Sequence, residues 1–324
     1  MTEPAIVTQG LSKRYGDFLA LDQVDLEVRT GEILGFLGPN GAGKSTAIKI
    51  LLDQVRPSAG TASVLGLDAR RGSAAIRARV GYLPGDLSLY PRLTGQQTLE
   101  FFAGMRGGVN WEVVTDLATR FDADLSKRVG EYSTGNRQKI GLIQAFMHEP
   151  ELLILDEPNA GLDPLLQETF HTLLEETRAQ GRTVFLSSHT LSEVERVADR
   201  VGIIRAGQVV VTAGVSDLKA TAIRLLDIEF AQPVSPTIFD DVATVHTADF
   251  DGTRVRVTYE GEVDAVVKAA AQHRVVSLSS RESDLEEIFL TYYRDTNKRV
   301  DDQEATDQLH TNPRDTLHPD RENR

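Results

Sequence analysis

The fold is decided by the stretch Gly38-Pro39-Asn40-Gly41-Ala42-Gly43-Lys44-Ser45-Thr46. It matches the phosphate-binding pattern G-x-x-x-x-G-K-[ST] at every fixed position. The apolar run at 33–37 predicts a buried strand before the loop, and residues 46–52 predict a helix after it. A chance glycine-rich turn would need both flanking elements to arise by accident. The sequence therefore predicts a strand, a phosphate-binding loop and a helix, in that order.

The residue types in this loop suit a polyphosphate. Glycines let the backbone curl so that successive N–H groups point inward at an anion. The helix that follows adds the partial positive charge of its N-terminus. Lys44 can reach the β- and γ-phosphates, and Ser45 can offer its hydroxyl to Mg²⁺.

Composition sets outer limits on the function. The chain has 324 residues, a length that suggests about two domains, and a hydrophobic fraction of 40% is enough for real cores. The net charge of −13 argues against nucleic acid as the main partner. There is no cysteine, which excludes a disulfide framework and a thiolate metal site.

The sequence contains no recognisable membrane-targeting segment. The first ten residues lack the basic-then-apolar layout of a signal peptide. No stretch approaches the roughly 18 uninterrupted apolar residues of a membrane-spanning helix. We therefore expect a cytoplasmic chain, and any membrane process that it serves needs another chain to supply the membrane part.

The first domain is predicted to span residues 4–220 and to contain a helical insertion. Alternating apolar and polar positions in 5–30 predict short strands of an antiparallel layer. Helical spacing recurs in 94–105 and 110–121. This stretch interrupts the alternation of strands and helices, which predicts a helical subdomain at about residues 87–148.

Acidic and basic side chains follow two further buried strands of this domain. The run 152–156 ends in Asp156, and Glu157 follows it. Beside a phosphate loop, Asp156 can hold Mg²⁺ directly or through water, and Glu157 can orient or deprotonate an attacking water. His189 comes just after the predicted buried strand 183–188, at the sheet edge where open α/β sheets bind ligands.

Two other candidates have little weight by themselves. Tyr15 lies between predicted strands, where its ring could stack on an adenine, but a lone tyrosine beside Gly16 is more often a turn residue. Ser133 and Gly135 form a turn before the apolar-periodic run 140–146. That turn is either an anion site at a helix start or an ordinary N-cap, and from the turn alone the N-cap is preferred.

A second, smaller domain is predicted at 223–294. Its order of strands and helices matches a β-α-β-β-α-β ferredoxin-like unit, with a linker or helix at 234–240, a strand at 242–248 and a last helix at 284–294. It has no recognisable catalytic constellation, which favours an accessory or regulatory module. Residues 296–324 have too few apolar side chains to bury a core and are predicted to be a disordered tail.

Taken in order, these motifs resemble the nucleotide-binding subunit of an ATP-binding cassette (ABC) transporter over residues 4–220. The resemblance implies an α/β P-loop NTPase with a RecA-like core, an antiparallel β layer and a helical subdomain. It identifies residues 38–46 as Walker A and Tyr15 as the adenine-stacking aromatic residue. Asp156 resembles the Walker B acid, and Glu157 resembles the catalytic glutamate.

The resemblance extends to three motifs of the composite site. Asp163 matches the D-loop, and His189 matches the switch histidine that contacts the γ-phosphate. The signature, usually Leu-Ser-Gly-Gly-Gln, falls on residues 132–136 and keeps Ser133 and Gly135.

Two residues depart from the family pattern. Thr134 replaces a signature glycine, which predicts a loss of backbone freedom. Gly85 replaces the Q-loop glutamine, whose role is then vacant or taken by a neighbour such as Asp86. Both departures resemble one branch of the ABC family, whose ATP-binding subunits serve separate permeases that export drugs, antibiotics or sodium. The stretches at 90–95 and 284–290 also resemble that branch.

The resemblance implies ATP and Mg²⁺ as ligands, a homodimer with two composite sites, and a separate integral membrane permease. The permease would couple through the surface near residues 80–100, and the chain would lie peripherally on the cytoplasmic face of the membrane. The implied activity is ATP hydrolysis that powers export of a drug, antibiotic or other hydrophobic small molecule. No nucleic-acid partner is expected.

Three alternatives remain for comparison. A soluble ABC ATPase acting on ribosomes or nucleic acid usually has two cassettes or a long coiled-coil insertion, and this sequence has neither. A P-loop GTPase would carry Asn-Lys-x-Asp, whereas Asn297-Lys298-Arg299-Val300 lacks the aspartate, and the signature turn and His189 have no role there or in a small-molecule kinase. A non-catalytic binding protein is disfavoured by Glu157.

Overall fold

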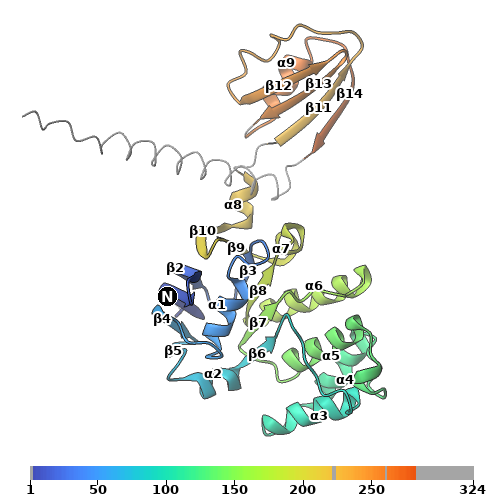
Figure 1. Cartoon of the computed structure of the whole chain (residues 1–324). Coiled ribbons are helices and arrows are strands. Elements are labelled where there is room, and N and C mark those ends of the chain that lie inside the picture. Colours follow the sequence, from blue (N-terminus) through green and yellow to red (C-terminus); the bar gives the residue numbers. More distant parts are fainter. Residues whose placement is uncertain (1–2, 221–223, 260, 282–324) are drawn as a thin grey trace, which may run out of the picture. The chain divides into compact units, whose positions relative to one another are not determined.

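The computed structural model describes residues 3–220, 224–259 and 261–281 (Figure 1). Contacts between Cα atoms divide the chain into two units, Met1–Leu218 and Lys219–Arg324. The predicted helix at 284–294 and the predicted tail at 296–324 lie outside the described residues.

The central feature of the first unit is a six-stranded sheet in the order β10-β9-β3-β8-β7-β6. Neighbouring strands pair in parallel, except that β10 is antiparallel to β9. The strands are β3 (Ile33–Leu37), β6 (Val80–Leu83), β7 (Leu152–Asp156), β8 (Thr183–Ser188), β9 (Arg200–Arg205) and β10 (Gln208–Gly214). β3, β7 and β8 are buried along their whole length, as their continuous apolar runs predict.

A second, antiparallel sheet forms the other layer of this unit, in the order β2-β1-β4-β5. Its strands are β1 (Ile6–Tyr15), β2 (Phe18–Val28), β4 (Ala59–Val64) and β5 (Leu67–Asp68). Helix α1 (Lys44–Leu51) contacts β2, β4 and β7, so it packs between the two sheets (Figure 1). One apolar core joins α1 to both sheets. The predicted antiparallel layer and the helix after the phosphate loop are thereby confirmed, although that helix begins two residues earlier than predicted.

The predicted helical subdomain contains α3 (Gly95–Met105), α4 (Trp111–Arg120), a 3-10 turn at Val129–Glu131 and α5 (Thr134–Phe146). Helix α3 begins with a capping box in which Thr94 and Gln97 satisfy each other's backbone N–H groups. Outside the helical subdomain lie α2 (Ser73–Arg79), α6 (Pro164–Ala179), α7 (Leu191–Val197) and α8 (Val215–Ala220). The sequence interpretation did not predict α2, α7 and α8.

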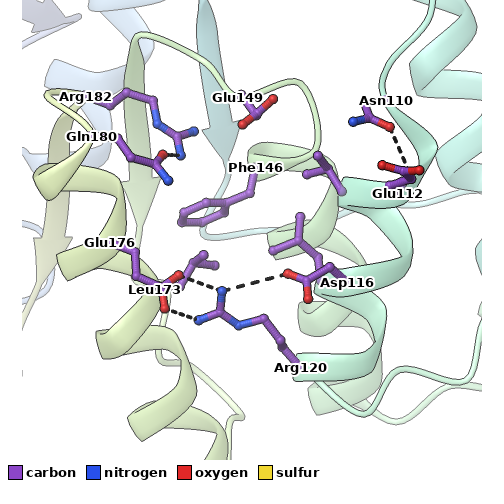
Figure 2. Close-up of a pocket in the computed structure, with 12 residues that line it drawn as sticks. Asn110, Glu112, Asp116, Arg120, Phe146, Glu149, Leu173, Glu176, Gln180 and Arg182 are labelled. Atoms are coloured by element: carbon purple, nitrogen blue, oxygen red, sulfur yellow. Dashed lines mark hydrogen bonds and ion pairs between the residues drawn. The ribbon is translucent and has the colours of Figure 1, made fainter.

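An ion pair joins the helical subdomain to α6 (Figure 2). Both terminal nitrogens of Arg120 on α4 reach Glu176 on α6, at 2.7 and 3.0 Å, and Asp116 lies 3.9 Å from the same guanidinium. Arg120 and Glu176 line a pocket of about 360 Å³, together with Phe146 and Leu173. The hydrogen bond to Glu176 raises the pKa of Arg120. Ion pairs as exposed as this one contribute at most about 1 kcal/mol, so it orients α4 more than it stabilises the fold.

The second unit is a four-stranded antiparallel sheet in the order β12-β13-β11-β14. Its elements are β11 (Arg224–Phe230), β12 (Val245–Asp251), β13 (Arg254–Tyr259), α9 (Asp264–Ala270) and β14 (Val275–Arg281). This strand order is that of the ferredoxin-like unit predicted from the sequence.

The second unit decides between two alternatives at 234–240 and shifts one strand. Of the linker and the helix predicted at 234–240, the linker is correct: the segment contains turns, because Pro236 interrupts it and Ser235 Oγ accepts the N–H of Thr237. Phe239 from these turns is buried against the sheet, so the segment covers the core without being helical. The strand predicted at 242–248 begins and ends three residues later, at Val245–Asp251.

Candidate functional site

The predicted site residues meet at one edge of the main sheet. Strand β8 lies between β3 and β7, and the three strands are parallel. Leu37 pairs with Ser188, and Asp156 pairs with Ser187, so the three strands end side by side. The phosphate loop, the two acids and His189 therefore all leave the sheet at the same edge, where α/β sheets bind their ligands.

The phosphate loop joins β3 directly to α1. Gly43 has a φ of +113°, and a Cβ there would lie 2.6 Å from the Ala20 carbonyl oxygen. At Gly38, a Cβ would lie 2.3 Å from the Ile204 carbonyl oxygen. Both positions therefore require glycine. The crest of the loop, residues 39–41, is exposed, as is Ser45, whereas Ala42 is buried and Thr46 is half-buried.

Lys44 is buried beneath this loop. Its side chain is only 5% exposed, and its Nζ donates to the carbonyl oxygens of Gly38 at 2.6 Å and Pro39 at 3.3 Å. Nζ also lies 3.2 Å from Oε1 of Glu157. The ammonium group is thus held where the loop and the strand-end acids meet, with a carboxylate as its counter-charge.

Glu157 joins Lys44 to His189. While Oε1 pairs with Lys44, Oε2 accepts the Nδ1–H of His189 at 2.7 Å. The backbone of Glu157 has a φ of +52°, a left-handed conformation that costs a non-glycine residue about 1 kcal/mol or more. Its N–H donates to Ser187 at the next strand, both to the hydroxyl and to the carbonyl oxygen. The structure thus brings three separately predicted side chains into one cluster.

Asp156 lies deeper than Glu157 and is 4% exposed. Its Oδ1 accepts the hydroxyl of Ser187 at 2.5 Å. A Cβ on Gly85 would lie 3.3 Å from Oδ2, so the residue at the Q-loop position lies directly against this carboxylate. Burial, and after it the Asp156 charge, raise the pKa of Tyr82. Tyr82 and Ser187 are neighbours of Asp156 that the sequence interpretation missed, because only strand pairing brings them there.

The donors in this cluster suit Mg²⁺. Asp156 supplies a carboxylate and Ser45 an exposed hydroxyl, and both are hard oxygen ligands. Within the described ranges there is no group of three or more His, Cys, Asp or Glu side chains that could hold a metal ion. Sparse protein ligation fits Mg²⁺ in phosphate sites, where one or two protein oxygens are completed by waters and substrate phosphates.

The predicted signature turn is a helix cap in this structure. Ser133 Oγ accepts the N–H of Asn136 at 3.2 Å and caps α5. Gly135 packs against the turn before α6, because a Cβ there would lie 2.5 Å from the Gly161 carbonyl oxygen. Thr134 begins α5 and is not among the residues with positive φ, so a glycine is not required at that position. Asp163 caps α6 by accepting the N–H groups of residues 165 and 166.

Tyr15 lies at the end of β1, paired with Phe18 on β2, and both rings are exposed. Lys13 Nζ lies 4.7 Å from the centre of the Tyr15 ring. Farther along β2, Ala20 contacts the phosphate loop at Gly43. The hairpin that holds Tyr15 therefore belongs to the strand pair that reaches the loop. Its stacking role remains a prediction, and Phe18 is a second exposed aromatic residue that the sequence interpretation missed.

Comparison with known proteins agrees with this geometry. A family model described as ABC transporter matches residues 21–160. The "Bacitracin transport ATP-binding protein BcrA" of Enterococcus faecalis is 32% identical over 296 residues, which cover 89% of this chain and 96% of that protein. The chain belongs to the ABC transporter ATP-binding proteins. The matched range includes the phosphate loop at 38–46.

Two further matches support membership of the ABC family. The "Probable multidrug ABC transporter ATP-binding protein YbhF" of Escherichia coli (strain K12) is 38% identical over 223 residues, 67% of this chain, but the match spans only 38% of that protein. A solved ATP-binding subunit of an ABC transporter is 32% identical, with a TM-score of 0.62 over 66% of this chain and 92% of that one. In the part that the structure describes, no helix is both long and apolar enough to cross a membrane.

The position of Lys44 yields a first prediction. Lys44→Ala should weaken ATP binding by at least about tenfold, because a buried cation within reach of the phosphates is lost. Lys49→Ala is the matched control, since Lys49 lies exposed on the same helix, and it should bind ATP as the parent does. Isothermal titration calorimetry measures both dissociation constants. Equal affinity in the two variants would contradict the role assigned to Lys44.

Proposed function

We propose that the chain hydrolyses ATP and thereby powers a separate membrane permease that exports a drug, an antibiotic or another hydrophobic small molecule. The observation that carries this proposal is the cluster of Lys44, Glu157 and His189 beside the Walker A loop. A nucleotide-binding protein without hydrolysis would need Lys44 but not a carboxylate held between a lysine and a histidine.

The geometry supports division of the chemistry among these residues. The amides of residues 39–43 and Lys44 bind the β- and γ-phosphates. Glu157 accepts a proton from the attacking water as the water oxygen bonds to the γ-phosphorus and the bond to the ADP oxygen breaks. His189 holds Glu157 through Nδ1 and offers its other edge to the γ-phosphate.

Mg²⁺ would be held by Ser45 and Asp156, together with the phosphates of ATP. When bound, it neutralises the charge that builds on the phosphate oxygens. Tyr15 is proposed to stack on the adenine, and its exposed ring beside Lys13 is consistent with that role.

A second copy of the chain would complete each site. Ser133 and Gly135 are on the cap of α5, in the helical subdomain, and we assign them to the nucleotide of the partner copy. An N-cap hydroxyl and the first amides of α5 suit an anion. A two-fold homodimer then has two equivalent sites, each with Walker A from one copy and the signature turn from the other.

A groove in the first unit is proposed as the permease contact. It has a volume of about 630 Å³ and is lined by residues of α2, β6, α3 and α5, by Leu52 just after α1, and by Leu87 and Leu89. Met105 at its margin is 71% exposed, and the nearby rings of Tyr90 and Phe101 are also exposed. The same groove includes Tyr82 of β6, the strand that pairs with β7, at whose end Asp156 lies.

The names of the relatives support the substrate class. The Enterococcus relative is named for bacitracin transport and the Escherichia relative for multidrug transport. With an associated permease, the chain would lie on the cytoplasmic face of the cell membrane as a peripheral subunit. No observation on the described residues favours a ribosomal or nucleic-acid role.

Replacing the proposed base tests hydrolysis directly. Glu157→Gln should keep ATP binding and slow phosphate release by roughly 10²- to 10⁴-fold, the usual contribution of a positioned general base. Glu175→Gln is the control, because Glu175 is exposed on α6. Steady-state phosphate release and ATP affinity are measured together. A Glu157→Gln variant that turns over at the parental rate would remove Glu157 from the mechanism.

The composite site is tested in the Glu157→Gln background, where unhydrolysed ATP should hold the dimer closed. Adding Ser133→Arg should abolish ATP-dependent dimerisation while single-site ATP affinity stays near normal, because the larger side chain blocks the approach of the partner. Asn110→Arg also removes an N-cap in the same subdomain and should leave dimerisation unchanged. Light scattering measures ATP-dependent dimerisation of the chain. The measurement is made first without permease-containing membranes and then with them. If the Ser133→Arg variant dimerises with ATP as its Glu157→Gln parent does, residues 132–136 act only as a helix cap.

The permease groove yields a separate prediction. Met105→Asp should reduce the fraction of chain retained on membranes of the host cell by at least about tenfold, because it puts a charge where an apolar partner packs. Thr115→Asp adds the same charge to exposed α4, outside the groove, and should stay bound. Quantitative blotting of washed membranes compares the two. Equal retention would place the permease contact elsewhere.

A further inference from the structure

Ser187 is a buried hydroxyl between the two acids of the site. It lies one residue before the end of β8, in register with Asp156 on β7, and its side chain is fully buried. A hydroxyl removed from water costs free energy unless it is hydrogen-bonded. In a strand end packed between β3 and β7, an alanine or valine would be the simpler choice. The polar residue therefore needs an explanation.

Its hydrogen bonds are directional and connect both acids. The N–H of Glu157 donates to Ser187 Oγ at 3.1 Å, so the hydroxyl oxygen is the acceptor in that contact. The hydroxyl proton is then available to Asp156, and Oγ lies 2.5 Å from Oδ1 of that carboxylate. Hydrogen bonds between a hydroxyl and a carboxylate are among the stronger ones.

The bond to Asp156 selects which carboxylate oxygen stays available. Oδ1 is engaged by Ser187, whereas Oδ2 faces Gly85, the position that has no side chain. Without the Ser187 bond the carboxylate could rotate about its terminal torsion, a broad and roughly two-fold one. The hydroxyl thus presents one oxygen of Asp156 in a single orientation.

The bond to Glu157 holds a strained backbone. Glu157 adopts a φ of +52°, and in that conformation its side chain meets Lys44 and His189. The Ser187 hydroxyl and carbonyl both accept the Glu157 N–H, at 3.1 and 3.3 Å, which secures this turn. Strain of this kind persists only where neighbouring groups hold it.

We propose that Ser187 is a positioning residue that sets the Mg²⁺-binding oxygen of Asp156 and the direction of Glu157 at the same time. This inference rests on the proposed ATPase function and names a residue that the family motifs do not include. Ser187 touches neither substrate nor metal in this assignment. It acts through the two acids, so its loss should affect metal-assisted binding and turnover together and leave metal-free nucleotide binding intact.

The experiment compares Ser187→Ala with Thr183→Val in the full chain. Thr183 has a buried hydroxyl at the other end of β8, and this hydroxyl accepts the N–H of Gly31. Thr183 pairs with Leu152 at the start of β7, whereas Asp156 is at the end of that strand. Both variants lose one buried hydroxyl from the same strand. Calorimetry measures the affinity for the non-hydrolysable analogue AMP-PNP, once with Mg²⁺ and once with EDTA, and phosphate release measures turnover of ATP.

Ser187→Ala should reduce the gain in affinity that Mg²⁺ provides, and also kcat, by roughly 10- to 100-fold, the usual effect of losing a hydrogen bond to a charged group. Its affinity in EDTA should match the parent. Ser187→Cys, which keeps the volume but is a poor donor, should behave like Ser187→Ala and replaces it if the alanine variant does not fold. Ser187→Thr restores the hydroxyl and should recover the Mg²⁺ effect. Thr183→Val should keep both values.

An unchanged Mg²⁺ effect in Ser187→Ala and Ser187→Cys would overturn the inference. An equal loss of affinity in Mg²⁺ and in EDTA would also overturn it, since that result means a general structural role. If the parent itself neither hydrolyses ATP nor gains affinity from Mg²⁺, the proposed function fails, and the inference fails with it. Failure of the inference alone is recognised by a fully active parent and an active Thr183→Val control.

Discussion

The parallel pairing of β3, β8 and β7 is the constraint on which the rest of the site depends. Each strand leads into one part of the candidate site: the phosphate loop follows β3, His189 follows β8, and β7 ends at Asp156 with Glu157 next in the chain. Because the ends are in register, side chains separated by more than a hundred residues in sequence come within hydrogen-bond distance. A shift of one strand by one residue would reverse the faces of its side chains and separate the cluster.

Electrostatics then links the loop to the acids. The Lys44 ammonium is buried, and it is paired both with loop carbonyl oxygens and with the Glu157 carboxylate. Under the proposed function, phosphate oxygens that enter the loop would compete with Glu157 for the same ammonium. Nucleotide binding would then free one oxygen of Glu157, while His189 holds the other. A buried charge is costly without a partner, so this exchange of partners is favourable only when an anion is present.

The helical subdomain is joined to the same cluster by close backbone contact. Gly135 on the cap of α5 lies against the Gly161 carbonyl, in the turn between the acids and α6. The Arg120–Glu176 pair fastens α4 to α6 as well (Figure 2). Packing within a single copy of the chain requires glycine at position 135.

The sequence by itself determined the buried strands that lead to the site, the phosphate loop and the candidates Asp156, Glu157 and His189, because apolar periodicity and fixed motif spacing are local properties. It did not predict α2, α7 and α8, it left a linker and a helix open at 234–240, and it missed Tyr82 and Ser187. Only the tertiary structure decided which carboxylate oxygen meets Lys44, that Gly85 lies against Asp156, and that Ser187 joins both acids. These contacts depend on the register between strands that are distant in sequence, and no local pattern encodes that register.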